Sequence, residues 1–196
     1  MITKGRLPAL ALEGRSAPAL VEAYFELNHL KQLYRQGWLR RGLPAERCES
    51  VAEHVFGMAM LAWWIADAAF PELDRDKVLR MILIHELGEI YTGDIVPADG
   101  VSPEEKHRQE REGFWKVAGK LPHGAEYLAL WEEFELGQTA EARFTRQLDR
   151  LEMAFQAAVY EHQDELSVDE FFASASAALL DPRLREIFEQ VVRREV

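Results

Sequence analysis

The residues best suited to chemistry follow an apolar segment at residues 81–84. His85 and Glu86 are adjacent there, Glu89 comes three residues later, and Asp94 follows after a further five. In a continuous helix His85 and Glu89 would share one face, and Glu86 would stand about 100° around the axis from His85. Imidazole nitrogens and carboxylate oxygens at this spacing can reach one divalent metal ion. An amphipathic helix with a hydrogen-bonded core histidine explains the same pattern, so residues elsewhere must decide.

Two more polar side chains stand beside apolar helical stripes. His54 falls in the first turn of an apolar helix that begins with a capping box, formed by Ser50 and Glu53. A buried histidine needs polar partners, and a metal ion is one such partner. Asp149 lies next to Leu148 in a long helical stripe, where an aspartate is either solvated, paired with an arginine, or a ligand.

The elements that would position these residues are predicted to be helices. Apolar residues recur at helical spacing from Ser16 onward, whereas residues 1–15 show no sustained periodicity and are predicted to form a loosely packed lead-in. Capping residues, glycines and prolines divide the domain at residues 16–196 into predicted helices at residues 16–36, 50–69, 74–90, 103–118, 127–134, 140–162, 169–179 and 182–196. Alternating strand patterns are absent, so the predicted fold class is all-α.

Composition limits the function classes. The 196 residues are 48% hydrophobic and 29% charged, as in globular proteins, and carry a net charge of −11. This charge argues against a surface that wraps nucleic acid. Cys48 is the only cysteine, which fits a reducing compartment, and no apolar run is long enough for a signal peptide or a membrane span. The sequence therefore predicts a cytoplasmic protein without nucleic-acid or membrane partners.

A predicted connector at residues 37–44 contains Trp38, Arg40 and Arg41. Arginine forks suit phosphate, and a tryptophan face suits a base or a sugar. A solvated loop with one anchoring aromatic residue accounts for the connector equally well.

Five motifs, taken in order, resemble those of the HD-domain metal-dependent phosphohydrolases, and within them the 5′-deoxynucleotidase-like subgroup. They are SVAEH at residues 50–54, HELGE at 85–89, GDIVPAD at 93–99, PEEKH at 103–107 and QLDRLEM at 147–153. The resemblance extends over roughly residues 30–191. It implies a single helical HD-type domain with a metal site between its central helices.

The resemblance also implies the metal ligands, which are His54, His85, Glu86 and Asp149. The family's dyad is His-Asp, whereas this chain has His85-Glu86, so its carboxylate is one methylene longer. Mixed nitrogen and oxygen ligands without thiolate suit Mn²⁺, Co²⁺, Fe²⁺ or Mg²⁺ at least as well as Zn²⁺. A divalent cation is therefore the expected cofactor.

The activity implied is removal of the 5′-phosphate from (deoxy)nucleoside monophosphates by a metal-activated water molecule. Glu89 and Asp94 are the candidate catalytic residues. Glu89 could act on the attacking water or protonate the leaving ribose oxygen, and either residue could instead hold a second cation or the sugar hydroxyl. The candidate substrate-binding residues are Arg35, Trp38, Arg41, Asp94 and Lys106.

The resemblance further implies a homodimer, for which Trp64, Trp131 and Phe172 are candidate interface residues. The remaining histidines, His29, His123 and His162, are predicted to lie at the surface.

Other functions remain open. The chain could be a non-catalytic metal-binding HD scaffold in which Glu86 fills the open coordination position. It could also be an HD-fold phosphohydrolase or oxygenase acting on another small phosphorylated or phosphonate substrate. A di-iron oxygenase is disfavoured because His107 and His123 do not stand at ligand-like spacing. A cyclic-dinucleotide phosphodiesterase is disfavoured because its Gly-Tyr-Pro signature is absent.

Overall fold

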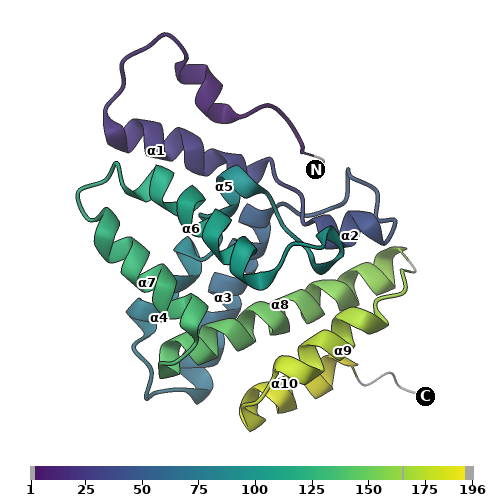
Figure 1. Cartoon of the computed structure of the whole chain (residues 1–196). Coiled ribbons are helices and arrows are strands. Elements are labelled where there is room, and N and C mark those ends of the chain that lie inside the picture. The colour runs from purple at the N-terminus through teal and green to yellow at the C-terminus, as the bar shows by residue number, and fades with distance from the viewer. Residues whose placement is uncertain (1–2, 165, 193–196) are drawn as a thin grey trace.

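The regular structure of this chain is helical, as the sequence predicts. The computed structural model describes residues 3–164 and 166–192, in which the only extended pairings are two isolated β-bridges (Figure 1). The α-helices are α1 Ala19–Leu27, α2 Gln36–Arg40, α3 Val51–Ala69, α4 Arg75–Ile84, α5 Glu89–Thr92, α6 Pro103–Ala118, α7 Gly124–Leu136, α8 Ala140–Asp164, α9 Asp169–Ala178 and α10 Pro182–Val192. Short 3₁₀ turns occur at Pro8–Leu12, Asn28–Lys31 and Pro97–Asp99.

The main core lies between α3, α4 and the long helix α8, with α9 and α10 packed on the other side of α8 (Figure 1). Met58 and Ala62 of α3 face Leu148 and Leu151 of α8, and all four are fully buried. The predicted capping box begins α3, because Ser50 N donates to Glu53 Oε2 at 2.6 Å and Glu53 N donates to Ser50 Oγ at 3.3 Å. This core holds α3 and α8 side by side.

The predicted helix over residues 74–90 is wrong at its C-terminal end. Helix α4 stops at Ile84, residues 85–88 form a turn, and α5 begins at Glu89. The carbonyl of His85 accepts a hydrogen bond from Trp131 Nε1 at 3.0 Å, while Glu89 N donates instead to Glu86 O at 3.0 Å. The indole of Trp131, on α7, thus takes the place of Glu89 N as hydrogen-bond donor to the carbonyl of His85. Local sequence periodicity cannot reveal such a contact.

The turn at residues 85–88 also packs closely against α6. A Cβ atom added to Gly113 would lie 2.4 Å from the carbonyl oxygen of Gly88, and one added to Gly88 would lie 2.7 Å from that of Glu110. We expect Gly113→Ala to lower the free energy of unfolding by about 1–3 kcal/mol, because one backbone must move. Urea unfolding measures this change. Glu112→Ala, at an exposed neighbouring position, is the control, and equal stability of Gly113→Ala and wild type would contradict the close packing.

The predicted helix over residues 16–36 is confirmed only over Ala19–Leu27 and is wrong beyond that residue. Helix α1 ends at Leu27, a 3₁₀ turn follows, and Gly37 lies inside α2 rather than after a helix. Tyr34 is extended and forms a bridge with Ser50. Hydrogen bonds of the bridge take the place of helical ones here, since Val51 N donates to Leu33 O and Arg35 N donates to Glu49 O. This pairing brings residues 33–35 beside the start of α3.

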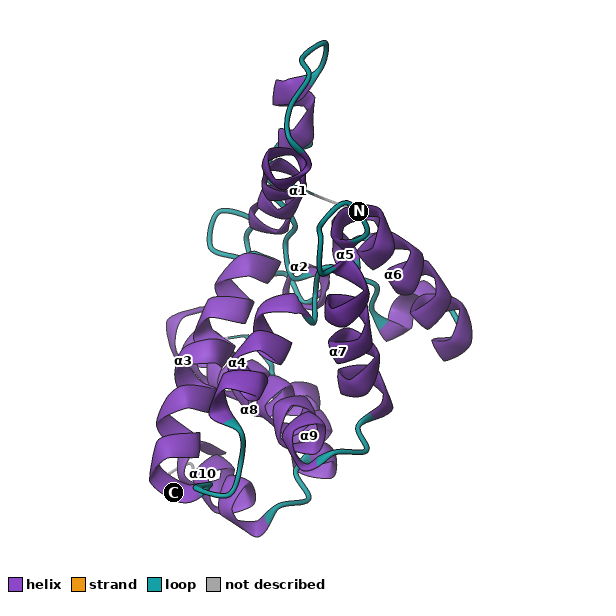
Figure 2. Ribbon diagram, turned by 90° about the vertical axis from the view of Figure 1, so that its left-hand side faces the viewer, coloured by secondary structure: helices purple, strands orange, loops and turns teal. Residues whose placement is uncertain are grey.

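The lead-in is attached to the body rather than loosely packed along its whole length. Thr3 bridges Leu33, and Lys4 N donates to Gln32 O at 2.7 Å. The tip between Pro8–Leu12 and α1 projects from the rest of the molecule (Figure 2). None of the helices among the described residues is long and apolar enough to cross a membrane.

Burial corrects three of the surface predictions. His29 is 5% exposed, and Trp131 and Phe172 belong to buried clusters, so these residues are not at the surface. Trp64, in contrast, is 62% exposed. The error at Trp131 arises because its indole reaches across to His85.

Cys48 is a buried thiol, and burial raises its pKa from 9.0 to about 12. The folded state therefore favours the protonated thiol, so the stability contributed at Cys48 is present below about pH 9 and is lost as the pH rises towards 12. We expect iodoacetamide to alkylate the native protein about 10³-fold more slowly than the urea-unfolded chain near pH 8, since only the thiolate reacts. Comparable rates in the two states would contradict a buried, protonated thiol.

Candidate metal centre

Four side chains from α3, α8 and the turn after α4 converge on one point. His54, His85, Glu86 and Asp149 each offer one ligand atom, and these atoms all lie within 4.8 Å of one another. Glu86 Oε1 is 3.3 Å from His85 Nε2 and 3.9 Å from His54 Nε2, and Asp149 Oδ1 is 3.2 Å from His54 Nε2. The structure thus brings together all four predicted ligands, although no continuous helix carries His85 and Glu86.

The two imidazoles are oriented for metal binding. Nδ1 of His85 lies 2.7 Å from the carbonyl oxygen of Ile82, and Nδ1 of His54 lies 2.6 Å from Glu152 Oε2. Both Nε2 atoms are buried and have no hydrogen bond of regular geometry, and each has a carboxylate oxygen 3.2 or 3.3 Å away. Because a buried polar atom without a partner is costly, these two nitrogens fit a cation placed between them.

The charges around His54 also favour a cation at this site. Burial and the charge of Arg35 lower the pKa of His54, but Asp149 and Glu152 outweigh them and raise it to about 10. Burial raises the pKa of Asp149, whereas its interaction with His54 lowers it more, so this carboxylate is ionised. Without a metal the carboxylates hold a proton on His54, and metal binding at such a site releases that proton.

Arg35 lies between the candidate metal ligand Glu86 and Asp94. Its Nη1 atom is 3.5 Å from Glu86 Oε1 and 3.7 Å from Asp94 Oδ1, and its side chain is 15% exposed. Burial lowers the pKa of Arg35, but Asp94 and Glu86 raise it further, so the net shift is upward. Gln36 N donates to Asp94 Oδ2 at 2.6 Å and fixes this carboxylate at the start of α2. A guanidinium therefore lies beside the candidate metal ligands.

Glu89 and Lys106 complete the charged surroundings. Glu89 is 3% exposed, and its Oε2 atom has no hydrogen-bond partner. Burial and the charges of Glu86 and Asp94 raise the pKa of Glu89 well above its ordinary value. Lys106 Nζ donates to Glu110 Oε1 at 2.5 Å, and the charges of Glu110, Glu89 and Glu86 together raise the pKa of Lys106 against the effect of burial.

Two of the predicted substrate-binding residues lie elsewhere. Trp38 is 2% exposed, its ring packs on Phe171 with 4.1 Å between centroids, and its Nε1 atom donates to Glu49 Oε1 at 2.8 Å. Arg41 forms an exposed ion pair with Glu170. The connector therefore directs Trp38 into the core and Arg41 towards α9. Of these three residues, Arg35 is the one that reaches a candidate metal ligand, Glu86.

Other histidines stay outside the cluster. His107 stacks on Trp131, with 5.1 Å between the ring centroids, and the side chain of His123 is 62% exposed. Neither belongs to the four-residue cluster that contains His54 and His85.

Two carboxylates that the sequence analysis did not single out touch the site residues. Glu152 contacts His54, and Glu110 contacts Lys106. The sequence spacing could have identified both carboxylates. Glu152 is three residues after Asp149 and Glu110 is four residues after Lys106, so each lies on the same helical face as that earlier residue.

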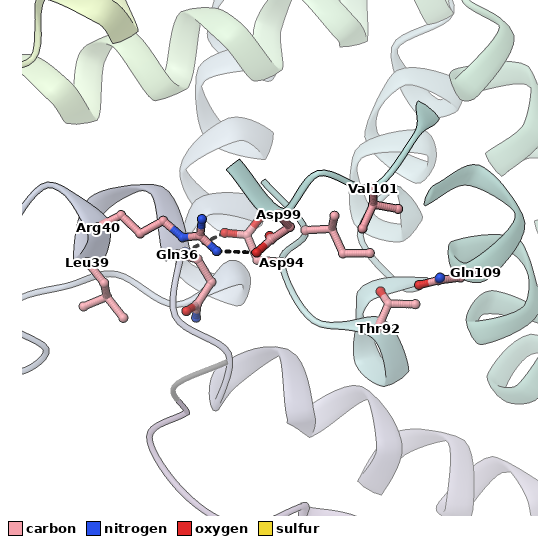
Figure 3. A pocket seen from close by; sticks show the side chains of 9 residues that line it. Gln36, Leu39, Arg40, Thr92, Asp94, Asp99, Val101 and Gln109 are labelled. Atoms are coloured by element: carbon pink, nitrogen blue, oxygen red, sulfur yellow. Dashed lines mark hydrogen bonds and ion pairs between the residues drawn. The ribbon is translucent and has the colours of Figure 1, made fainter. Parts of the chain in front are cut away.

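A cleft of about 500 Å³ opens beside Asp94 (Figure 3). Figure 3 shows Arg40 reaching from α2 to Asp99, with which it forms an ion pair, while Thr92 and Gln109 line the other side. The walls combine apolar and amide side chains, contributed by Gln36, Leu39, Ile95, Val101 and Gln109. Asp94 belongs both to this cleft and to the charged surroundings of the metal ligands.

Comparison with known proteins agrees with this geometry. A family model described as HD domain matches residues 27–191. The human 5′-deoxynucleotidase HDDC2 is 34% identical over 182 residues, which cover 91% of this chain and 87% of that protein. The solved structure of PH0347 from Pyrococcus horikoshii OT3 superposes with a TM-score of 0.74 at 29% sequence identity. The aligned region covers 87% of this chain and 97% of the PH0347 chain. A protein described as a predicted metal-dependent phosphohydrolase, from Magnetospirillum magnetotacticum MS-1, has a TM-score of 0.66 at 30% identity over 89% of each chain. This chain belongs to the HD-domain family and, within that family, to the 5′-deoxynucleotidase-like group.

Proposed function

We propose that the protein is a metal-dependent phosphohydrolase that removes the 5′-phosphate of (deoxy)nucleoside monophosphates. One observation carries the proposal: the four-residue cluster and the largely buried guanidinium of Arg35 lie next to Asp94, which also lines a cleft of about 500 Å³. The relatives named 5′-deoxynucleotidases supply the substrate class. A cleft of this volume lies in the range of small-molecule sites.

His54, His85, Glu86 and Asp149 would hold one divalent cation. Such a cation supplies an activated water molecule and neutralises charge on the phosphoryl group. The ligand set contains two nitrogens, two oxygens and no sulfur, which suits Mn²⁺, Co²⁺, Mg²⁺, Fe²⁺ or Zn²⁺. The longer side chain of Glu86 still reaches the other ligands, since its Oε1 atom stands 3.3 Å from His85 Nε2.

The chain's own cations would bind the phosphate. Arg35 can donate to the phosphate oxygens from between Glu86 and Asp94, and Lys106 approaches the same region from α6. These two groups offset the negative field of the carboxylates, which would otherwise repel a phosphate monoester. Arg35 and Lys106 are accordingly the phosphate-binding residues of the proposal.

Glu89 would supply the proton for the leaving 5′-oxygen. Its carboxyl is buried, its pKa is raised, and its Oε2 atom has no partner, so it can hold a proton and give it up to a bound substrate. Asp94 would accept a hydrogen bond from a sugar hydroxyl at the edge of the cleft, while Gln36 N fixes its orientation. The nucleoside would then extend into the cleft lined by Leu39, Ile95 and Val101.

The test is phosphate release from a panel of deoxyribo- and ribonucleoside 5′-monophosphates with added Mn²⁺, Co²⁺ or Mg²⁺. We expect metal-dependent release that EDTA abolishes and that is faster with the deoxy substrates. Absence of release with every metal and every substrate would overturn the proposal. Tight metal binding without release would instead support the non-catalytic scaffold.

We also expect the protein to form a homodimer. Trp64 is the predicted interface residue that remains exposed, and it lies on α3, which also carries the exposed side chains of Phe56 and Trp63. Light scattering at several protein concentrations tests the mass. A monomer at all concentrations would contradict the expectation.

A further inference from the structure

Glu152 is a buried carboxylate that the proposed chemistry does not use. It lies on α8, three residues after Asp149, and is 7% exposed. Its Oε2 atom is 2.6 Å from Nδ1 of His54, whereas Asp149 Oδ1 is 3.2 Å from Nε2 of the same ring. Two carboxylates on one face of α8 therefore engage the two nitrogens of one imidazole.

The two contacts differ in what they can do. Asp149 faces the cluster and is itself a predicted ligand, while Glu152 lies behind the ring. An ionised carboxylate has no proton to donate and can only accept, so a hydrogen bond to Glu152 requires the ring proton on Nδ1 and leaves the Nε2 lone pair directed at the cluster. His85 is fixed by the neutral carbonyl of Ile82 instead. The charged partner is thus specific to His54.

We propose that Glu152 is a positioning residue of the metal centre: its hydrogen bond to Nδ1 fixes the tautomer and the ring orientation in which His54 presents Nε2 to the cation. The inference rests on the metal site of the proposed function, but not on its substrate. Histidine ligands held by a carboxylate are better donors to the metal, because the carboxylate stabilises positive charge on the ring.

Gly57 provides the space for this arrangement. It lies three residues after His54 on α3, and a Cβ atom added there would stand 2.8 Å from Glu152 Oε1. A glycine inside a helix costs about 1 kcal/mol relative to alanine. The contact with Glu152 explains its presence in the middle of a long helix that otherwise packs into the core.

Metal affinity is the direct test, measured by calorimetry with Mn²⁺ and without nucleotide. We expect Glu152→Gln, which keeps the shape but removes the charge, to weaken Mn²⁺ binding about 10–100-fold. Gly57→Ala should also weaken Mn²⁺ binding, because the added methyl group on α3 would displace the Glu152 carboxylate, which belongs to α8. Glu186→Gln on α10, where the side chain is exposed, removes the same charge and should leave the affinity unchanged.

A second readout separates positioning from a purely structural role. In ¹⁵N spectra of the wild-type protein loaded with Zn²⁺, His54 should carry its proton on Nδ1 and bind zinc through Nε2. This measurement uses the wild-type protein, so it does not depend on whether the variants fold. Zinc bound through Nδ1 would overturn the proposal, as would a folded Glu152→Gln protein whose Mn²⁺ affinity is within about twofold of wild type. Because no nucleotide is present, a failed phosphatase assay does not affect either result.

Discussion

Asp149→Asn is expected to lower metal-dependent phosphate release by about 10³-fold or more. The substitution keeps the shape of the side chain but replaces the ionised carboxylate of a proposed metal ligand by a neutral amide. Several kcal/mol of charge stabilisation depend on a properly held cation, and about 1.4 kcal/mol corresponds to a factor of ten in rate. Phosphate release at saturating Mn²⁺ measures the loss, and calorimetry measures the accompanying loss of metal affinity.

The structure also predicts how Asp149→Asn differs from a folding defect. Asp149 contacts His54 Nε2 at 3.2 Å, so in the metal-free protein its loss removes one of two anions that hold a proton on His54. Far-UV circular dichroism should remain that of a helical protein. Asp76→Asn, at an exposed position in the first turn of α4, is the matched control and should retain full activity. Wild-type activity in Asp149→Asn would remove Asp149 from the metal site.

Much of the site was predictable because its residues sit on elements with strong local signals. The capping box at Ser50 and Glu53 fixes the start of α3, and hence the turn that carries His54. The apolar stripe around Leu148 fixes the face of α8 next to Asp149. In both helices local periodicity and tertiary packing agree, so the sequence pattern was sufficient.

What the sequence could not provide are the places where a distant contact overrides the local pattern. The apolar run before His85 continues as a helix only to Ile84, because Trp131 takes the carbonyl of His85 and Gly113 admits the backbone of residue 88. The helix predicted up to residue 36 gives way to the pairing of Tyr34 with Ser50. That pairing determines which neighbours residues 35–41 contact. It places Arg35 at the candidate metal ligand Glu86 and Trp38 in the core.

Arg35→Ala is expected to impair both stability and catalysis. In the metal-free protein Arg35 is a cation next to both Glu86 and Asp94, with 15% of its side chain exposed. Removing one partner of a buried ion pair costs about 3–5 kcal/mol, because the remaining charges are left uncompensated. Urea unfolding in EDTA measures this loss. Mn²⁺ should recover part of the stability, since a cation at Glu86 again offsets the carboxylates.

The catalytic effect of Arg35→Ala should appear in KM. A charge-assisted hydrogen bond to phosphate contributes about 1.5–3 kcal/mol, which corresponds to about a 10–100-fold rise in KM for a nucleoside monophosphate. Arg35→Lys keeps the charge but loses the fork, so it should fall between wild type and Arg35→Ala. Arg108→Ala is the control, because Arg108 pairs with Glu105 and Glu112 at the surface and contributes little there. If Arg35→Ala matched wild type in both KM and metal-free stability, phosphate recognition would have to be reassigned to Lys106, the other cation whose pKa responds to the charges of Glu86 and Glu89.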